Sequence, residues 1–486
     1  MHISSRRQLA RRLFGAASTP AEAPRSAVVQ PPPSLERQML ARATFGSNRD
    51  VANDMRTMGP DVWLEEQLHP DSISDVGVEH MVATAIEPWE DNAADLRMLI
   101  RAMYSRRQLA WRMVYFLNRH FSTYGARTQG ISETKEDDGF YARCFGSFEN
   151  VLRMSATSPA MIDFLDLGSN VAGNPNENYA RELLELHTIS IDGGYTEADV
   201  AKVARVFTGW GRTNVGGGVG NPVTNSYFTF NAVNHDAGPK TLSLGWSTPG
   251  LAGFHGRREG VELLRFLAGS TRTAIFFTKK LCLYFVGDEP PAALQSRVRQ
   301  AFQASGGSLR DTVRALFMDP DFATASAGRN KTHDGFEFVV NVLRRFYKGD
   351  VSPAEIRTRI AALRSLPHGS PSPKGYPEVG SAWHGPGNLL PRWQFADDYA
   401  HDRITATTVP WTKLFPSVPY NGMLWVRGLE GHLLDEPLPD STTWALALFM
   451  DKRLAPLPSH PSWAQVLPHA RALLSFMLQL PEMQLH

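Results

Sequence analysis

The chain has 486 residues, of which 42% are hydrophobic and 20% charged, and its 50 Lys and Arg against 49 Asp and Glu give a formal net charge of +1. These values are ordinary for a globular protein with a sizeable core. They exclude a disordered chain and argue against a nucleic-acid-binding protein held by a general basic field. No apolar run approaches the ~18 residues of a membrane-spanning helix, so we expect no transmembrane segment.

Residues 1–34 differ in composition from the rest of the chain. They carry five arginines against one glutamate and end in a run of prolines. Ser5–Leu9 resembles the start of a twin-arginine export signal. Arg11 and Arg12, however, interrupt the apolar stretch that a signal peptide needs. We interpret this Pro- and Ala-rich basic segment either as a degraded export signal or as a disordered arm.

From Leu35 onward, apolar residues recur at three- and four-residue steps, which is typical of amphipathic helices. The strongest long stretch is 93–120, with a break near Ser105. Thr196 and Asp199 predict a capping box at the start of one later helix. The other predicted helices are 35–46, 49–69 (broken at Gly59–Pro60), 138–156, 158–166, 176–190, 197–210, 257–268, 271–287, 290–304, 308–318, 334–348, 393–407, 441–453 and 462–480.

Residues 211–256 interrupt this helical pattern, because they are rich in Gly, Asn and Thr. We expect a long loop with one short β-hairpin formed by Ser226–Asn231 and Lys240–Leu244. A loop of this length in a compact chain is usually functional or disordered. The predicted fold class is therefore mainly α: a multi-helix globular fold with an irregular Gly/Asn-rich insertion that carries a short β-hairpin. Residues 35–486 are predicted to form a single large helical domain, with a subdivision considered near 211–256.

The two cysteines, Cys144 and Cys282, lie in apolar helical contexts and are expected to be buried free thiols. They form no CxxC pair, and the chain has no HExxH motif. The commonest zinc signatures are therefore missing.

The densest polar segment of the chain is Asn176–His187. At 100° per residue, four of its side chains fall within an arc of about 100° on a helix; they are Asn178, Arg181, Glu182 and Glu185. His187 falls on the opposite, apolar side and is expected to be a core histidine. One interpretation is a solvated face with an Arg181–Glu185 ion pair. The other is an inward-facing site whose carboxylates bind a divalent ion or act as general acid and base.

A second candidate site lies at the end of the glycine-rich loop. There an imidazole, a carboxylate and an ammonium fall within one turn, at His235, Asp236 and Lys240. Loop residues of this kind often bind ligands. The alternative is a structural turn in which Asp236 caps backbone N–H groups.

Two single residues have both a binding and a structural interpretation. His120 ends the long helix, where a cation is favoured by the helix dipole, but it can equally be a ligand. Arg392 stands beside Trp393, where a guanidinium can bind an anion or stack on the indole.

The chain resembles a bacterial family known only as domain of unknown function 1800, over about residues 35 to 400. The family tends to have Trp and Asn before a His–Phe pair, whereas this chain has Leu117 and Arg119 before His120. The segments that carry the resemblance are LERQMLARATFG at 35–46, WLEEQ at 63–67, NENYARELLELHTIS at 176–190, DGGYTEADVAKVARVFTGW at 192–210, HDAGPKTL at 235–242, TAIFFTKKLCLYFV at 273–286 and the GYP, Trp and LLPRWQFA elements within 375–396.

This resemblance implies an exported protein, periplasmic or extracellular, that is encoded beside a second exported, sulfatase-like family. The missing apolar stretch in residues 1–34 keeps a cytoplasmic location open. The resemblance implies no established activity.

Two functions are therefore predicted. The first is an acid/base or metal-dependent enzyme, hydrolase-like, that acts on an envelope or extracellular substrate. The alternative is a non-catalytic helical binding or assembly protein that works with the co-encoded exported partner.

In the enzyme, a divalent Zn, Mn or Fe ion is expected at Glu182, Glu185 and His235. Lys240 would neutralise developing negative charge. The full catalytic set is Glu182, Glu185, Arg181, His235, Asp236 and Lys240, and the binding set is Asn178, Tyr179, His120 and Arg392.

Overall fold

The computed structural model describes residues 34–217, 223–346, 351–405 and 407–485. Ser34–His486 form one compact unit. The predicted N-terminal arm lies outside the described residues, apart from Ser34. The described chain is mainly α-helical with two small antiparallel sheets, as the sequence predicts.

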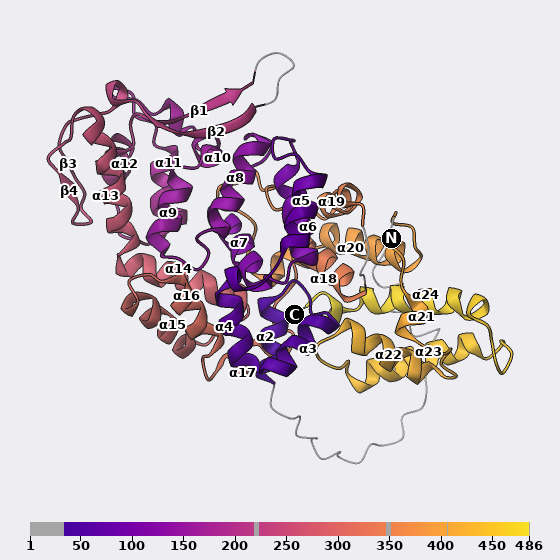
Figure 1. The fold of residues 1–486 in the computed structure, drawn as a ribbon. Coiled ribbons are helices and arrows are strands. Elements are labelled where there is room, and N and C mark those ends of the chain that lie inside the picture. The colour runs from indigo at the N-terminus through magenta and orange to yellow at the C-terminus, as the bar shows by residue number, and fades with distance from the viewer. Residues whose placement is uncertain (1–33, 218–222, 347–350, 406, 486) are drawn as a thin grey trace. The chain divides into compact units, whose positions relative to one another are not determined.

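The first half of the chain contributes helices α2 (Leu35–Ala43), α3 (Arg49–Met58), α4 (Pro60–Leu68), α5 (Val76–Ala85), α6 (Ala93–Tyr104), α7 (Gln108–His120), α8 (Gly130–Tyr141), α9 (Phe148–Ala156), α10 (Pro159–Phe164), α11 (Asn178–Glu182) and α12 (Glu197–Val206) (Figure 1). The second half contributes α13 (Arg257–Ala268), α14 (Thr271–Phe285), α15 (Ala292–Ala304), α16 (Leu309–Phe317), α17 (Phe322–Ser326), α18 (Gly335–Phe346), α19 (Pro353–Ala362), α20 (Pro386–Ala400), α21 (Trp411–Leu414), α22 (Gly422–Leu433), α23 (Asp440–Leu454) and α24 (Trp463–Gln479).

Two predicted helix boundaries are confirmed by their caps. Ser105 takes an extended conformation and separates α6 from α7, and its hydroxyl donates to Asp75. The Thr196 hydroxyl accepts from Asp199 N–H while the Asp199 carboxylate accepts from Thr196 N–H, which completes the predicted capping box of α12.

The predicted helix 138–156 is wrong, because two helices occupy this region. Ser147 caps α9 by accepting from Asn150 N–H at 3.3 Å, and so a new helix begins there. The preceding helix, α8, does not show the apolar periodicity used for the prediction, because its buried face carries three acids, Glu133, Glu136 and Asp137. Helices α5, α19 and α22 are likewise additional to the prediction, and α20 begins earlier than predicted, at Pro386.

The predicted hairpin is corrected by the strand pairing. Strand β1 (Trp210–Gly216) pairs with β2 (Val223–Phe230), and β3 (Lys240–Thr241) pairs with β4 (Ser247–Thr248). Helix α12 ends at Val206, and Gly209, at φ +81° in the turn that follows, lets the chain enter β1 at Trp210. The Trp210 ring then packs edge-on against Phe228 at 4.9 Å. This aromatic contact favours β1 over the Lys240–Leu244 segment as the partner of β2.

Helix α7 is buried along its whole length, including two arginines. Arg112 pairs with Glu337, and Arg119 pairs with Asp334; both acids lie at the start of α18. Asp334 and Glu337 also bond each other's backbone N–H groups, at 3.1 and 2.9 Å, which forms a capping box. The Tyr115 hydroxyl donates to Asp334 at 2.7 Å. These charge pairs fix how α7 and α18 lie against each other.

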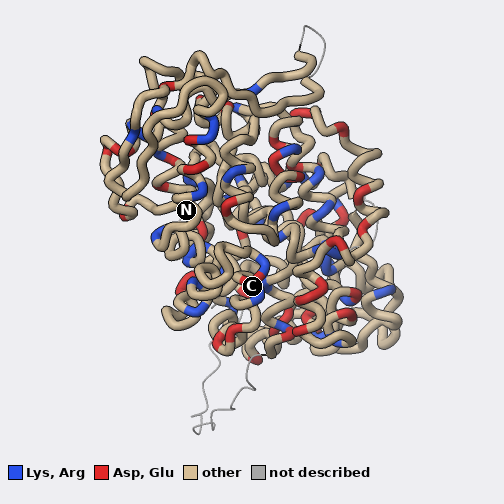
Figure 2. The backbone as a smooth tube through the Cα atoms, turned by 60° about the vertical axis from the view of Figure 1, so that its left-hand side comes forward, with Lys and Arg blue, Asp and Glu red and all other residues tan. Residues whose placement is uncertain are grey.

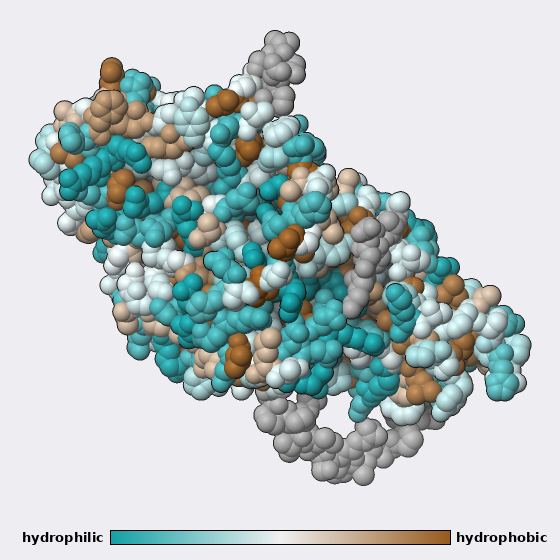
Figure 3. All heavy atoms as spheres, in the orientation of Figure 1, coloured by the Kyte–Doolittle hydropathy of each residue, from teal (hydrophilic) through white to brown (hydrophobic). Residues whose placement is uncertain are grey.

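The cysteines and the distribution of charged and apolar residues are those expected of a globular protein. Cys144 and Cys282 are buried free thiols, as predicted. Basic and acidic residues are interspersed along the chain (Figure 2), and the face drawn in Figure 3 is mainly hydrophilic with scattered hydrophobic residues. Within the described residues, we find no helix with the length and apolar character needed to cross a membrane.

Replacing Arg112 by Met should lower the free energy of unfolding by ~3–5 kcal/mol, because it removes the ion-pair partner of the buried Glu337 carboxylate. Urea unfolding followed by circular dichroism measures this change. The double variant Arg112→Met with Glu337→Leu should recover most of the loss. Arg258→Met, which breaks an exposed i,i+4 pair with Glu262, is the matched control and should change the stability by less than ~1 kcal/mol. Equal effects at Arg112 and Arg258 would contradict the assignment.

Candidate functional site

The predicted polar helix is not a regular α-helix. α11 ends at Glu182, and a π-helix, Leu183–Thr188, continues it directly. Ile189 N–H donates to Leu184 C=O at 3.0 Å, which is a bond to the fifth preceding residue. π-helices are rare in proteins, and those that do occur are often found at functional sites. The unusual backbone geometry therefore occurs in the same part of the chain as the dense polar pattern.

The two sides of this helix follow the predicted periodicity. Leu183, Leu184 and His187 are buried. Burial, together with the charge of Lys280, lowers the pKa of His187 to about 3, so this core histidine is neutral. Glu182 and Glu185 are half-buried on the outer side.

Arg181 does not form the predicted ion pair with Glu185. Its guanidinium instead bonds both carboxylate oxygens of Glu197 at 2.8 Å and also Glu177 at 3.2 Å. In the described part of the chain, neither Glu182 nor Glu185 has a hydrogen-bond or ion-pair partner. The two carboxylates are thus neighbours whose charges no cation neutralises directly.

The electrostatics of this carboxylate pair follow from that arrangement. Burial and then the charge of Glu185 raise the pKa of Glu182, and Arg181 only partly opposes them. Burial and Glu185 also raise the pKa of the Tyr195 phenol, so Tyr195 lies in the field of the same pair. A carboxyl group with a raised pKa beside a second carboxyl group is an arrangement suited to general acid–base chemistry.

A small hollow of about 170 Å³ adjoins the end of the π-helix. Gly194, in the turn before Tyr195, lies close to this hollow. A Cβ on Gly194, which has φ +74°, would be 3.3 Å from the guanidinium of Arg272, and Arg272 lines the hollow. Arg272 is exposed and has no hydrogen-bond or ion-pair partner within the described ranges. The residues lining the hollow are Ile189, Leu244, Phe266, Leu267, Ser270, Thr271 and Arg272.

The second predicted cluster forms a separate, buried network. His235 Nδ1 bonds Thr208 C=O at 2.9 Å, and its Nε2 lies 3.7 Å from a carboxylate oxygen of Glu259. Lys240 donates to Glu259 at 2.7 Å, and neither charged side chain is exposed. Lys240 and Glu259 are thus held by a structural bond, whereas His235 Nε2 has no hydrogen-bond partner among the described residues.

Asp236 has the capping role that was the alternative interpretation. Its carboxylate accepts from Gly238 N–H at 2.8 Å and from Arg205 at 2.6 and 3.1 Å. The Arg205 charge and the hydrogen bond it donates lower the pKa of Asp236 to about 2. This carboxylate is a fixed anion within a turn.

The structure does not bring the two predicted clusters together. Glu197, the partner of Arg181, begins α12, and Arg205, the partner of Asp236, lies in its last turn. Eight residues of helix separate these anchors by about 12 Å. Among the described residues, no three His, Cys, Asp or Glu side chains could hold a metal ion. The predicted metal set of Glu182, Glu185 and His235 is therefore not assembled.

The predicted binding residues are mostly core residues. Tyr179 is 2% exposed and packs edge-on against Phe207. His120 is buried, and its Nε2 bonds the His187 carbonyl at 3.0 Å. Asn178 alone lies on the surface, where it contacts Asp166 at 3.4 Å.

Arg392 neither stacks on Trp393 nor faces solvent. Its guanidinium donates to His333 C=O at 2.7 Å and to Gln484 at 3.2 Å, and it lies over the Phe338 ring at 5.5 Å. In the structure, Arg392 therefore contacts the ring of Phe338 in the core and not the indole of Trp393.

Sequence reasoning missed one buried polar cluster around His368. Its two ring nitrogens lie 3.3 Å from Asp95 and 3.1 Å from Asp137, and Glu133 is 3.7 Å away. Burial opposes protonation, but Asp137 and Glu133 outweigh it and raise the pKa of His368 well above its ordinary value. The only signal was a run of acids where an apolar helix face is usual. The groups neutralise one another inside the core.

Replacing Glu185 by Gln should lower the pKa of Glu182, because it removes the neighbouring negative charge that raises it. Carboxyl carbon NMR of specifically labelled protein measures the titration. Glu177→Gln, which removes a more distant acid bonded to Arg181, should have a smaller effect. An unchanged titration in Glu185→Gln would show that the two carboxylates are not neighbours.

Comparison with known proteins agrees with the segments that carry the resemblance. The profile of a family described as protein of unknown function (DUF1800) matches residues 38–485. No curated protein and no solved structure matches the chain. Because the match covers nearly the whole chain, the protein belongs to the DUF1800 family.

Proposed function

We propose that the protein is an acid/base enzyme of the hydrolase class, with Glu182 and Glu185 as its catalytic carboxyl groups. The observation that carries this proposal is the unneutralised carboxylate pair at the junction of α11 and the π-helix, with a hollow that begins at Ile189, directly after the π-helix. Perturbed carboxyl groups cluster at functional sites, because catalysis needs a proton donor and an acceptor at one pH.

In this mechanism, Glu182 is the proton donor and Glu185 the base. Glu185 takes a proton from water as the water oxygen bonds to the electrophilic carbon. Glu182 gives its proton to the leaving atom as the old bond breaks. The products together contain the elements of water, and the two carboxyl groups have exchanged protonation states.

The hollow beside the π-helix is the proposed substrate contact. Arg272 would bind a negatively charged substituent, and the apolar wall formed by Ile189, Leu244 and Phe266 would hold an uncharged part. The phenol of Tyr195 can donate a hydrogen bond near the carboxylates. A metal does not enter this mechanism, because the donor set does not fit one.

Glu182→Gln and Glu185→Gln should each lower kcat/KM by ~10²–10⁴-fold, because each removes one proton-transfer group. Chromogenic glycosides, esters and amides are the probes, and initial rates are the measurement. Glu177→Gln is the matched control and should retain the wild-type rate. The wild-type rate should fall as the pH rises through the raised pKa of Glu182, because the donor loses its proton. Unaltered hydrolysis by Glu182→Gln would sink the proposal.

A second candidate is the non-catalytic binding or assembly protein. The observation that favours it is a set of exposed apolar side chains on the C-terminal helices: Trp444 and Leu448, one turn apart on α23, and Phe476 on α24 are 66%, 49% and 50% exposed. Exposed apolar patches mark interaction sites. Its partner would be the co-encoded exported, sulfatase-like protein that the family resemblance implies.

We further propose a periplasmic or extracellular location, which the family resemblance and the arginine pair near the N-terminus support. Residues 1–33 fused to a reporter that is active only in the periplasm should give activity. Arg6→Lys with Arg7→Lys should abolish it, whereas Arg25→Lys should not. An inactive wild-type fusion would contradict the export interpretation and favour the cytoplasm.

A further inference from the structure

Two adjoining hollows lie between helices from opposite ends of the chain. The first, of about 500 Å³, is lined by α2, α3 and α22. The second, of about 530 Å³, is lined by the start of α3, the end of α18, α21 and α22. They share four residues, Asn48, Arg49, Arg345 and His432. We call the two hollows together the cationic groove.

Four cations of this groove have no carboxylate partner among the described residues. Arg37 and Lys413 have no side-chain partner, Arg56 bonds only the neutral Asn53, and Arg49 bonds only His432. All four are exposed. They are free to meet an anion that enters the groove.

His432 positions Arg49 without neutralising it. The Arg49 guanidinium lies 3.0 Å from His432 Nε2, and an arginine can only donate, so this nitrogen is the acceptor of a neutral ring. Burial, followed by the charge of Arg49, lowers the pKa of His432 and keeps the ring neutral. Arg49 therefore retains its full charge in the wall that both hollows share.

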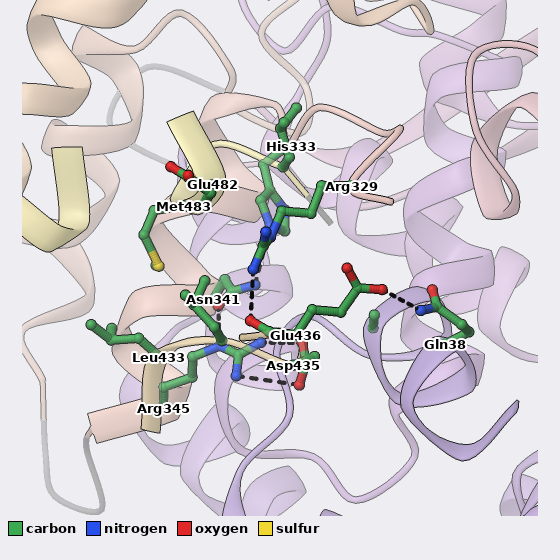
Figure 4. Close-up of a pocket in the computed structure, with 13 residues that line it drawn as sticks. Gln38, Arg329, His333, Asn341, Arg345, Leu433, Asp435, Glu436, Glu482 and Met483 are labelled. Atoms are coloured by element: carbon green, nitrogen blue, oxygen red, sulfur yellow. Dashed lines mark hydrogen bonds and ion pairs between the residues drawn. The ribbon is translucent and has the colours of Figure 1, made fainter. Parts of the chain in front are cut away.

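The acids of the groove lie in the first hollow, and two are already paired. Asp435 bonds Arg345, and Glu430 bonds Arg427 at 2.7 Å. Figure 4 draws a separate, smaller pocket of about 30 Å³, which shares Arg345, Asp435 and Glu436 with the first hollow. There Gln38 donates to Glu436 at 2.8 Å, and Arg345 pairs with Asp435. Glu36 is the remaining acid. None of the described residues that line the second hollow is acidic.

Some apolar surface accompanies the charges of the groove. Leu434 in the first hollow and Pro410 and Leu414 in the second are half-buried, whereas the lining residues Leu40 and Phe346 are buried. Each hollow is of the size that encloses a compact ligand. Such a groove fits a chain that carries anionic groups together with some apolar ones.

We propose that the cationic groove binds an acidic peptide segment of a partner protein, in which Asp or Glu residues occur together with some apolar ones. Its carboxylates would pair with Arg37, Arg49, Arg56 and Lys413. A single-stranded nucleic acid fits less well, because base stacking needs exposed aromatic rings. Among the described lining residues the only Phe, Tyr or Trp is Phe346, which is 4% exposed. No residue of the carboxylate pair lines the groove, so this binding site is independent of the proposed catalysis.

Fluorescence polarisation of the full chain with a labelled peptide of alternating Glu and Leu tests the proposal. Binding should be saturable and should weaken with added salt, because salt screens exposed charge pairs. Arg49→Glu and Lys413→Glu should each weaken the affinity about tenfold or more. Lys279→Glu reverses an exposed lysine on α14 that has no ion-pair partner among the described residues. It is the matched control and should leave the affinity unchanged.

Three results would overturn the proposal. They are equal affinity of Arg49→Glu and wild type, equal affinity for a Gln–Leu peptide, and tighter binding of a single-stranded oligonucleotide of the same length than of the acidic peptide. Lys413→Gln, a milder change, together with circular dichroism of each variant, separates loss of binding from loss of folding. Retained hydrolysis in the groove variants would show that a failure here leaves the catalytic proposal intact.

Discussion

The arrangement of the helices depends on two buried ion pairs between α7 and α18. A guanidinium in the core is tolerated only where a carboxylate and further hydrogen bonds compensate its lost hydration. Arg112 and Arg119 each find a carboxylate at the start of α18, where Asp334 and Glu337 also cap the helix. Arg112 in addition lies over the Tyr284 ring at 4.5 Å, and Arg119 donates to the Pro377 carbonyl. An apolar interface tolerates small shifts of one helix along the other, but these paired charges do not. The two helices can therefore pack in one register only.

The same kind of compensation surrounds Arg119, the residue at which the chain departs from the expected family pattern. Its buried guanidinium donates to Asp334 and to the Pro377 carbonyl at 2.8 Å, with Glu378 3.4 Å away. Two acids and a carbonyl thus accommodate this charge in the core. These contacts link α7 to the segment before α20. The neighbouring His120 retains its own buried bond to His187.

The sequence allowed prediction of those parts of the structure that local pattern controls. Most of the helices with an apolar face, the Ser105 break and the α12 capping box follow from spacing, whereas α5, α19 and α22 were not predicted. The outward side of Glu182 and Glu185 and the buried side of His187 follow in the same way. Helix α8 did not, because its buried face is acidic and one of its partners, His368, which pairs with Asp137, lies far along the chain. Glu197 and Glu259, the partners of Arg181 and Lys240, could not be predicted either. Contacts between different elements of the fold leave no periodic pattern in the sequence.

The buried pairs also have a consequence for the order in which the chain can fold. Arg112 and Glu337 are 225 residues apart, and Arg119 and Asp334 are 215 apart. Contacts this distant form late, because closing so long a loop costs entropy before the contact rewards it. During synthesis, α7 is complete long before its acids emerge from the ribosome. Until α18, about two-thirds of the way along the chain, has been synthesised, Arg112 and Arg119 have no carboxylate partner in the core. The final packing of α7 and its neighbouring amino-terminal helices therefore has to follow the synthesis of α18.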